Sequence, residues 1–250
     1  MVKFGEYVPL LGADHMLYLG GFFLVLFLMV YYRDAIRQNR RRADLVLAAV
    51  IVFQQTVLYT SYAVFFDFTL GEALPLHICR LASLMILAWI ATENRTCYVL
   101  AAVYGLFAFL SFVYPSRVYG VVHPIGWSFF LSHAVNLLFP LYAYIAGGET
   151  LKKEDIAFAY KVFLGYFVFV YFLNPLIDGN YFYLRYKPVV GDMSDLIYVP
   201  AVLILCRLLF EFGSRLYMHL LERLTELPRA SGRFGDRTAR LFESVLRFGK

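Results

Sequence analysis

The sequence predicts an all-α, polytopic membrane protein, a bundle of about seven transmembrane helices. Apolar residues make up 61% of the chain and charged residues only 16%, whereas a soluble domain is about half apolar. Long apolar runs recur along the chain, and the links between them are short. Positive charge is concentrated in alternate links, which is typical of a chain that crosses a membrane repeatedly.

The apolar segments are judged by length, because a helix needs roughly 20 residues to cross the hydrocarbon core. They run roughly over residues 15–32, 45–66, 75–92, 97–114, 127–146, 158–177 and 195–213. The links leave no room for a soluble domain, so we expect residues 1–214 to form one seven-helix transmembrane domain. The first segment has no basic region ahead of it and is followed by arginines, so we expect a retained span and not a cleaved signal peptide.

The charge distribution predicts the orientation. The link "RDAIRQNRRRAD" holds five arginines, whereas the next link, "DFTLGEA", holds none and carries Asp67 and Glu72. Lys152, Lys153 and the arginine-rich tail lie on the same side as the first link. Because cytoplasmic loops carry the excess of Lys and Arg, we expect the N-terminus outside and the C-terminus in the cytoplasm.

The net charge of +5 is explained by this topology, so no nucleic-acid partner is expected, and the lipid bilayer is the predicted surrounding. We expect an integral, multi-pass protein, located in the cell membrane if its source is bacterial. Residues 215–250 are predicted to form a basic amphipathic cytoplasmic tail. Its segment "RTARLFESVLRFGK" alternates Arg with apolar residues and is expected on the inner membrane surface, with a solvated tail as the alternative.

Polar residues gather in the predicted outer half of the membrane. His15 opens the first span, His77 and Cys79 open the third, and His133 lies about two turns into the fifth. The outer loop between the last two spans adds Asn174, Asp178, Asn180, Arg185 and Lys187. Ionisable residues inside a membrane are costly, so this cluster predicts a functional site.

Cys79 is the candidate nucleophile of this cluster. Pro75 suits the first helical position, so the positive end of the third span is expected to point toward Cys79. That helix end and the neighbouring Arg80 favour a thiolate, whereas burial of the side chain favours the neutral thiol. The sequence leaves the balance between these effects open.

The base for this cysteine is expected from another helix. His77 is two residues from Cys79 and therefore nearly opposite to it on a helix. His133 lies at a similar depth in the fifth span, and Asn136, three residues later, shares its face. A Cys–His pair oriented by an amide is a recurring nucleophile arrangement.

Each of these residues also has a structural alternative. Cys79 can be a small buried hydrophobic residue, and His133 with Asn136 can be an interhelical hydrogen-bonding pair. Arg80 can extend to the outer interface or bind a lipid phosphate, and we prefer the phosphate. His15 can be an interfacial residue without a further role.

A zinc site is the main rival chemistry. Histidines and a thiolate would suit zinc, but HExxH and CxxC spacings are absent, and we expect no carboxylate within a span near the histidines. Nucleotide-binding and serine-hydrolase motifs are absent as well. No metal and no soluble cofactor is therefore predicted.

Several segments resemble one family of membrane proteins. They are "GADHMLYL", "LPLHICRLASL", "FFLSHAVNLLFPLY", "GNYFYLRYKP" and "DLIYVPAVLIL". In combination and order, over about residues 10 to 212, they resemble the bacterial YwaF-like integral membrane proteins and their eukaryotic relative, transmembrane protein 164. The resemblance implies a seven-helix lipid acyltransferase that works through an acyl-cysteine intermediate. By motif position it implies Cys79 as nucleophile and His133 as base, with His77, Asn180 and Lys187 lining the site or binding a headgroup.

The predicted function is thus a cysteine-dependent acyltransferase near the outer leaflet, with phospholipid and lysophospholipid as substrates. His77, Arg80 or Asn180 would bind the phosphate or the carbonyl oxygen, and Asn136, Lys187 and His15 would complete the substrate site. A hydrolase that uses water as acceptor is the near variant. The alternatives are a non-enzymatic seven-helix transporter or lipid-binding protein, and a zinc-dependent lipid hydrolase. The oligomeric state is not predicted.

Overall fold

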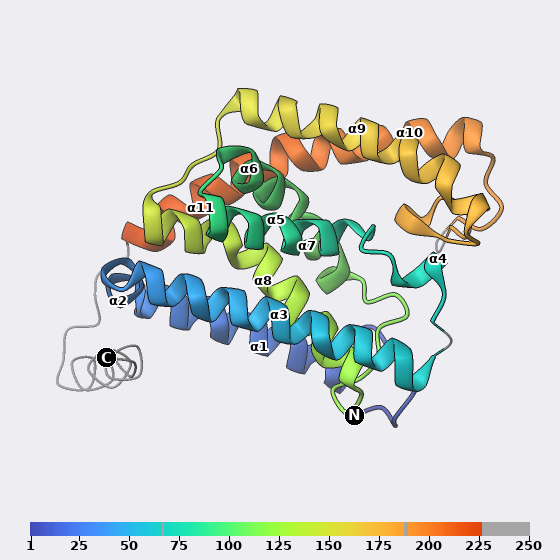
Figure 1. Ribbon diagram of the computed structural model, residues 1–250, viewed down its shortest axis with the longest axis horizontal. Coiled ribbons are helices and arrows are strands. Elements are labelled where there is room, and N and C mark those ends of the chain that lie inside the picture. The colour runs from blue at the N-terminus through green and yellow to red at the C-terminus, as the bar shows by residue number, and fades with distance from the viewer. Residues whose placement is uncertain (67, 188–189, 227–250) are drawn as a thin grey trace.

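The computed structural model describes residues 1–66, 68–187 and 190–226, and within these ranges the secondary structure is helical (Figure 1). Six helical stretches are long and apolar enough to cross a membrane. They are α1 (Ala13–Tyr31), α3 (Arg40–Phe65), α6 with α7 (Arg95–Val113), α8 (Pro124–Gly147), α9 (Lys153–Leu176), and α10 through α11 (Asp195–Leu224). The prediction of an integral, multi-pass, all-helical protein is confirmed.

The third predicted span is shorter than expected. Helix α5 covers Ile78–Thr92, and its 15 residues extend about 22 Å, less than the ~30 Å of a hydrocarbon core. The expectation that Pro75 takes the first helical position is wrong, because His77 is the N-cap. The short helix α4 (Leu70–Ala73) and an irregular turn occupy the space before α5.

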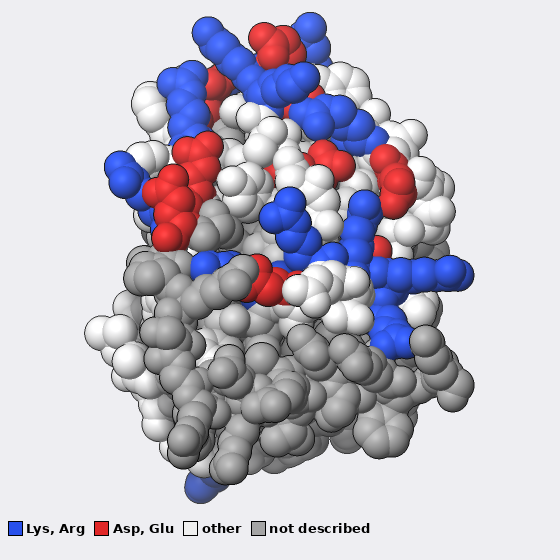
Figure 2. Space-filling view, turned by 90° about the vertical axis from the view of Figure 1, so that its left-hand side faces the viewer, with Lys and Arg blue, Asp and Glu red and all other residues white. Residues whose placement is uncertain are grey.

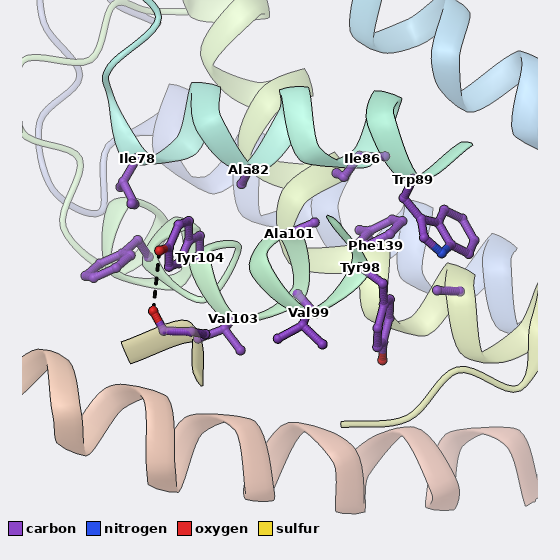
Figure 3. Packing of buried hydrophobic residues seen from close by; sticks show 14 of the residues in the cluster. Ile78, Ala82, Ile86, Trp89, Tyr98, Val99, Ala101, Val103, Tyr104 and Phe139 are labelled. Atoms are coloured by element: carbon purple, nitrogen blue, oxygen red, sulfur yellow. Dashed lines mark hydrogen bonds between the residues drawn. The ribbon is translucent and has the colours of Figure 1, made fainter. Parts of the chain in front are cut away.

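Helix α8 is the central helix of the bundle. It contacts α1, α2 (Arg33–Gln38), α3, α5, α6, α7 (Phe107–Val113) and α11. In the apolar stretch of α8, 67% of the residues are buried, whereas in that of α1 only 17% are. Helix α1 therefore lies at the periphery. Between α5, α6 (Arg95–Tyr104) and α8, Trp89 and Tyr98 pack around Phe139, with 5.2 Å between the Trp89 and Phe139 rings (Figure 3).

The close approach of the α6–α7 junction to α8 depends on a glycine. Helices α6 and α7 are separated at Gly105 and Leu106, where the Gly105 backbone lies against the Asn136 carbonyl. A Cβ atom there would overlap the carbonyl oxygen, although the Gly105 φ of −57° suits any residue. Glycine is required here for the close approach of two backbones.

The final helix extends beyond the predicted domain boundary. Helix α10 (Asp195–Leu208) continues through the π turn η2 (Leu209–Gly213) into α11 (Ser214–Glu226). The Tyr217 hydroxyl donates to the Leu137 carbonyl of α8, and Leu221 is buried. The first turns of the predicted tail therefore pack on the bundle. The segment "RTARLFESVLRFGK" lies outside the described residues.

Gly105→Ala should lower the free energy of unfolding by about 1–3 kcal/mol, because the added methyl group must displace the α8 backbone at Asn136. Thermal unfolding in detergent micelles measures the effect. Gly165→Ala in α9 is the matched control, since no atom lies within 4 Å of the added Cβ there. Equal unfolding temperatures for the two variants would contradict the steric account.

Candidate active site

Cys79 lies in the first turn of α5, where a buried amide fixes it to α8. The Asn136 Nδ2 donates to the Cys79 carbonyl at 2.7 Å, and the Ser83 hydroxyl donates to Asn136 Oδ1 at 2.9 Å. Asn136 and Ser83 are fully buried, whereas Cys79 is half-buried. The link holds the Cys79 backbone and does not engage its sulfur atom.

His133 lies one turn before Asn136 on α8 and has a defined tautomer. Its Nδ1 lies 2.8 Å from the Phe129 carbonyl, which can only accept, so Nδ1 carries the proton and Nε2 keeps its lone pair. The ring packs at 4.2 Å from the Phe129 ring. Among the described residues no hydrogen bond joins the Cys79 sulfur to either imidazole, and such bonds often form only with substrate bound.

His77 lies directly ahead of α5 beside an acidic residue. Its Nε2 is 3.7 Å from Glu72 Oε2, and its ring meets Tyr181 edge to face at 4.8 Å. The imidazole beside it lowers the pKa of the Glu72 carboxyl, so Glu72 stays ionised at neutral pH. Tyr181 is fully buried and donates its hydroxyl to the Leu70 carbonyl at 2.8 Å, which fixes this wall of the site.

Arg80 is buried and holds the turn ahead of α5. Its guanidinium donates to the Glu72 carbonyl at 2.7 Å, to the Leu74 carbonyl at 3.1 Å and to the Tyr62 hydroxyl of α3. Only 8% of the residue is exposed. Arg80 thus has a structural role that the sequence did not indicate, and phosphate binding by Arg80 stays a prediction.

His15 has no free ring nitrogen. Its Nδ1 accepts from the Leu11 N–H at 2.9 Å, and its Nε2 donates to the Phe112 carbonyl at 2.7 Å. The expectation that no carboxylate lies within a span near a histidine is wrong at Asp14. That side chain is buried and accepts from the Val121 N–H at 3.0 Å. Asp14 and His15, at the start of α1, hold loops together, and lipid binding by His15 stays a prediction.

Asn180 and Lys187 are likewise engaged within the protein. The Asn180 Oδ1 accepts the N–H groups of Arg185 and Tyr186, both at 3.0 Å, and its Nδ2 donates to the Tyr186 carbonyl. Lys187 Nζ is 2.6 Å from Asp195 Oδ1, and its side chain is 8% exposed. Both residues organise the loop before α10, and their headgroup roles stay predictions.

Residues 10–213 match the model of one protein family, described as the TMEM164 family. The chain belongs to the TMEM164 family. No curated protein and no solved structure matches it. The TMEM164 match encloses the chain from before α1 to the end of η2, and so includes Cys79, His133 and Asn136.

Two residues near Cys79 in this TMEM164 family chain were not predicted from the sequence. Ser83 is four residues after Cys79 and therefore on its helix face, a spacing that would have identified it. Tyr166 donates its hydroxyl to the Leu76 carbonyl at 2.7 Å and interacts electrostatically with Cys79. It is one of 20 tyrosines, so no sequence signal distinguished it.

No group of three or more His, Cys, Asp or Glu side chains is placed to hold a metal ion within residues 1–66, 68–187 and 190–226. The polar groups that contact Cys79 or adjoin it in the chain are the Asn136 carboxamide, the Ser83 hydroxyl and the His77 imidazole. Such a set can carry proton transfer and orient a nucleophile.

The Ser83–Asn136 bond predicts coupled stability. Ser83→Ala and Asn136→Ala should each destabilise the protein by about 1–3 kcal/mol, because each leaves a buried polar group without its partner. In a double-mutant cycle by thermal unfolding, the interaction energy should be at least about 0.5 kcal/mol. If the stability losses of the two single variants add up to that of the double variant within about 0.3 kcal/mol, the two residues act independently.

Arg80→Lys should destabilise the protein by about 1–3 kcal/mol, since an ammonium cannot present the planar fork that reaches three acceptors. The exposed Arg223→Lys is the control and should change stability by less than about 0.5 kcal/mol. If Arg80→Lys were as stable as the wild type, the hydrogen bonds to the carbonyls would contribute little to stability. The guanidinium would then be available to a phosphate.

Proposed function

We propose that this protein is a membrane-embedded, cysteine-dependent acyltransferase that moves an acyl chain from a phospholipid to a lysophospholipid. The observation that carries the proposal is the link between α5 and α8. Asn136 fixes Cys79 through its backbone carbonyl, and His133, with an unprotonated Nε2, lies on the same helix as Asn136, one turn away. Membership of the TMEM164 family supports the assignment of Cys79, which lies in the segment that carries the resemblance.

In the first half-reaction the Cys79 sulfur attacks the ester carbonyl carbon of the donor phospholipid. A carbon–sulfur bond forms and the ester carbon–oxygen bond breaks. His133 Nε2 takes the thiol proton and gives it to the departing glycerol oxygen, so that a lysophospholipid leaves. The protein then holds a thioester and His133 is neutral again.

In the second half-reaction the hydroxyl of an acceptor lysophospholipid attacks the thioester carbonyl. His133 takes the hydroxyl proton and returns it to the sulfur as the carbon–sulfur bond breaks. The products are a new phospholipid and free Cys79, so atoms and protons balance without a cofactor. A water molecule in place of the acceptor would release a fatty acid instead.

The start of α5 supplies groups for the charge that develops on the carbonyl oxygen. The first N–H groups of a helix have no intrahelical acceptor, and here they belong to Ile78 and Cys79. Such N–H groups and the helix dipole stabilise an oxyanion and a thiolate. His77, the N-cap, is the nearest imidazole to these N–H groups along the chain and is assigned to carbonyl or phosphate binding.

We place the site at the outer leaflet. The arginine-rich link forms α2 and the start of α3, whereas the turn ahead of Cys79 follows α4 at the other end of the long helices (Figure 1). With the arginines in the cytoplasm, Cys79 lies on the outer side. Donor and acceptor lipids would then reach it laterally from that leaflet.

The test is turnover with a defined lipid pair. Purified protein in nanodiscs receives phospholipid with an isotope-labelled acyl chain and an unlabelled lysophospholipid. We expect labelled product, and mass spectrometry should find the acyl group on Cys79. Cys79→Ala should abolish both signals, because no nucleophile remains, and His133→Gln should slow turnover about 10²–10⁴-fold.

Cys97→Ala is the matched control, since Cys97 is also half-buried but opens α6, near Thr92 at the opposite end of α5. It should retain turnover and the Cys79 adduct. Unchanged turnover in Cys79→Ala would overturn the nucleophile assignment. Release of labelled fatty acid without labelled phospholipid would identify a hydrolase built on the same residues.

A further inference from the structure

A cavity lies on the face of α8 that meets α1 and α3. It lies between α1, α3 and α8, and its volume of about 310 Å³ is within the size range of ligand pockets, about 300–1,000 Å³. Its walls include Val25 and Met29 of α1, Leu47 and Val50 of α3, and Leu131 and Leu138 of α8. His133 and Asn136 do not line it, so it is separate from the candidate active site.

The cavity is apolar and reaches the membrane-facing surface. Its only polar side chain is that of Tyr142, whose hydroxyl already donates to Asp44 at 2.6 Å. One lining residue, Val46, is 54% exposed, so the cavity opens sideways between the helices. Apolar cavities exclude water and take apolar ligands. Within a bilayer, the apolar group at this opening is an acyl chain.

Two exposed arginines lie in the segment next to one end of the cavity. Ile36 and Ala43 line that end, and the chain between them contains Arg37 and Arg41, both exposed. The described structure gives neither of them a carboxylate partner. Figure 2 shows Lys and Arg side chains on this end of the molecule, with Asp and Glu side chains among them.

The local electrostatics favour an anion at this end. Helix α3 starts with three arginines and has no acidic residue in its first turn, although the N-terminal end of a helix is positive. Arg40 is paired with Glu93 at 2.7 Å, which leaves Arg37 and Arg41 for an external anion. A guanidinium binds phosphate in a two-point arrangement, and each basic residue near the surface strengthens binding to an anionic lipid.

We propose that this cavity and the arginines beside it bind one anionic phospholipid, with an acyl chain between α1, α3 and α8 and the phosphate at Arg37 and Arg41. The charge of the site selects the anionic lipid over a zwitterionic one. The cavity selects a lipid over a soluble phosphate. The site makes no use of Cys79, so it stands independently of the proposed reaction.

Retention of lipid by the full-length protein tests the proposal. Protein is equilibrated with equal amounts of phosphatidylglycerol and phosphatidylcholine, and bound lipid is counted by native mass spectrometry. We expect one phosphatidylglycerol per chain, favoured by about tenfold or more over phosphatidylcholine. The double variant Arg37→Gln/Arg41→Gln should lose this preference, and Cys79→Ala should keep it.

Two further variants separate charge from shape. Lys153→Gln/Arg223→Gln removes the same charge from exposed positions outside the cavity and should keep the preference within about twofold. Leu47→Trp fills the cavity and should reduce retention of both lipids. Millimolar glycerophosphoglycerol, the headgroup without chains, should not displace the bound lipid.

Equal retention of the two lipids by the wild type would overturn the proposal. So would an equal loss of preference in Lys153→Gln/Arg223→Gln, because the effect would then be one of net charge. Displacement by the headgroup alone, or full retention in Leu47→Trp, would overturn the assignment of the acyl chain to the cavity.

Discussion

The structure depends on one constraint, that backbone carbonyls at membrane depth must find hydrogen-bond donors. Helix α5 begins late, so the turn ahead of it exposes carbonyls that no helix satisfies. Side chains from other elements supply the donors: Arg80 for Glu72 and Leu74, and Tyr166 for Leu76. Tyr181 donates to Leu70, which also accepts from the Leu74 N–H. A buried arginine and two tyrosines therefore maintain the turn that places Cys79 at a helix start.

Two contacts at Asn136 connect α8 to its neighbours. Its Asn136 donates to the Cys79 carbonyl, and the Gly105 backbone packs against its Asn136 carbonyl. One face of α8 thus joins the candidate nucleophile to α6 and α7 through direct backbone contacts. The face that meets α1 and α3 contains an apolar cavity. A single helix separates a polar, tightly packed region from an apolar, open one.

The polar cluster predicted from the sequence divides into two groups in the structure. The Cys79 sulfur and His133 Nε2 make no hydrogen bond within the described chain. By contrast, both nitrogens of His15 and both polar atoms of the Asn180 carboxamide are engaged. A polar residue in a membrane therefore has two uses. It can act on a ligand, or it can satisfy the protein's own backbone.

The sequence by itself determined the membrane class, the apolar segments, the family and the shared face of His133 and Asn136, because composition, run length and helical spacing are local properties. It misplaced the start of α5 and overlooked Asp14, Ser83 and Tyr166. Only the tertiary structure decided which polar groups are engaged, because their partners are distant in the chain. Asn136 meets Cys79 across 57 residues and Tyr166 meets Leu76 across 90, and no local pattern encodes such pairs.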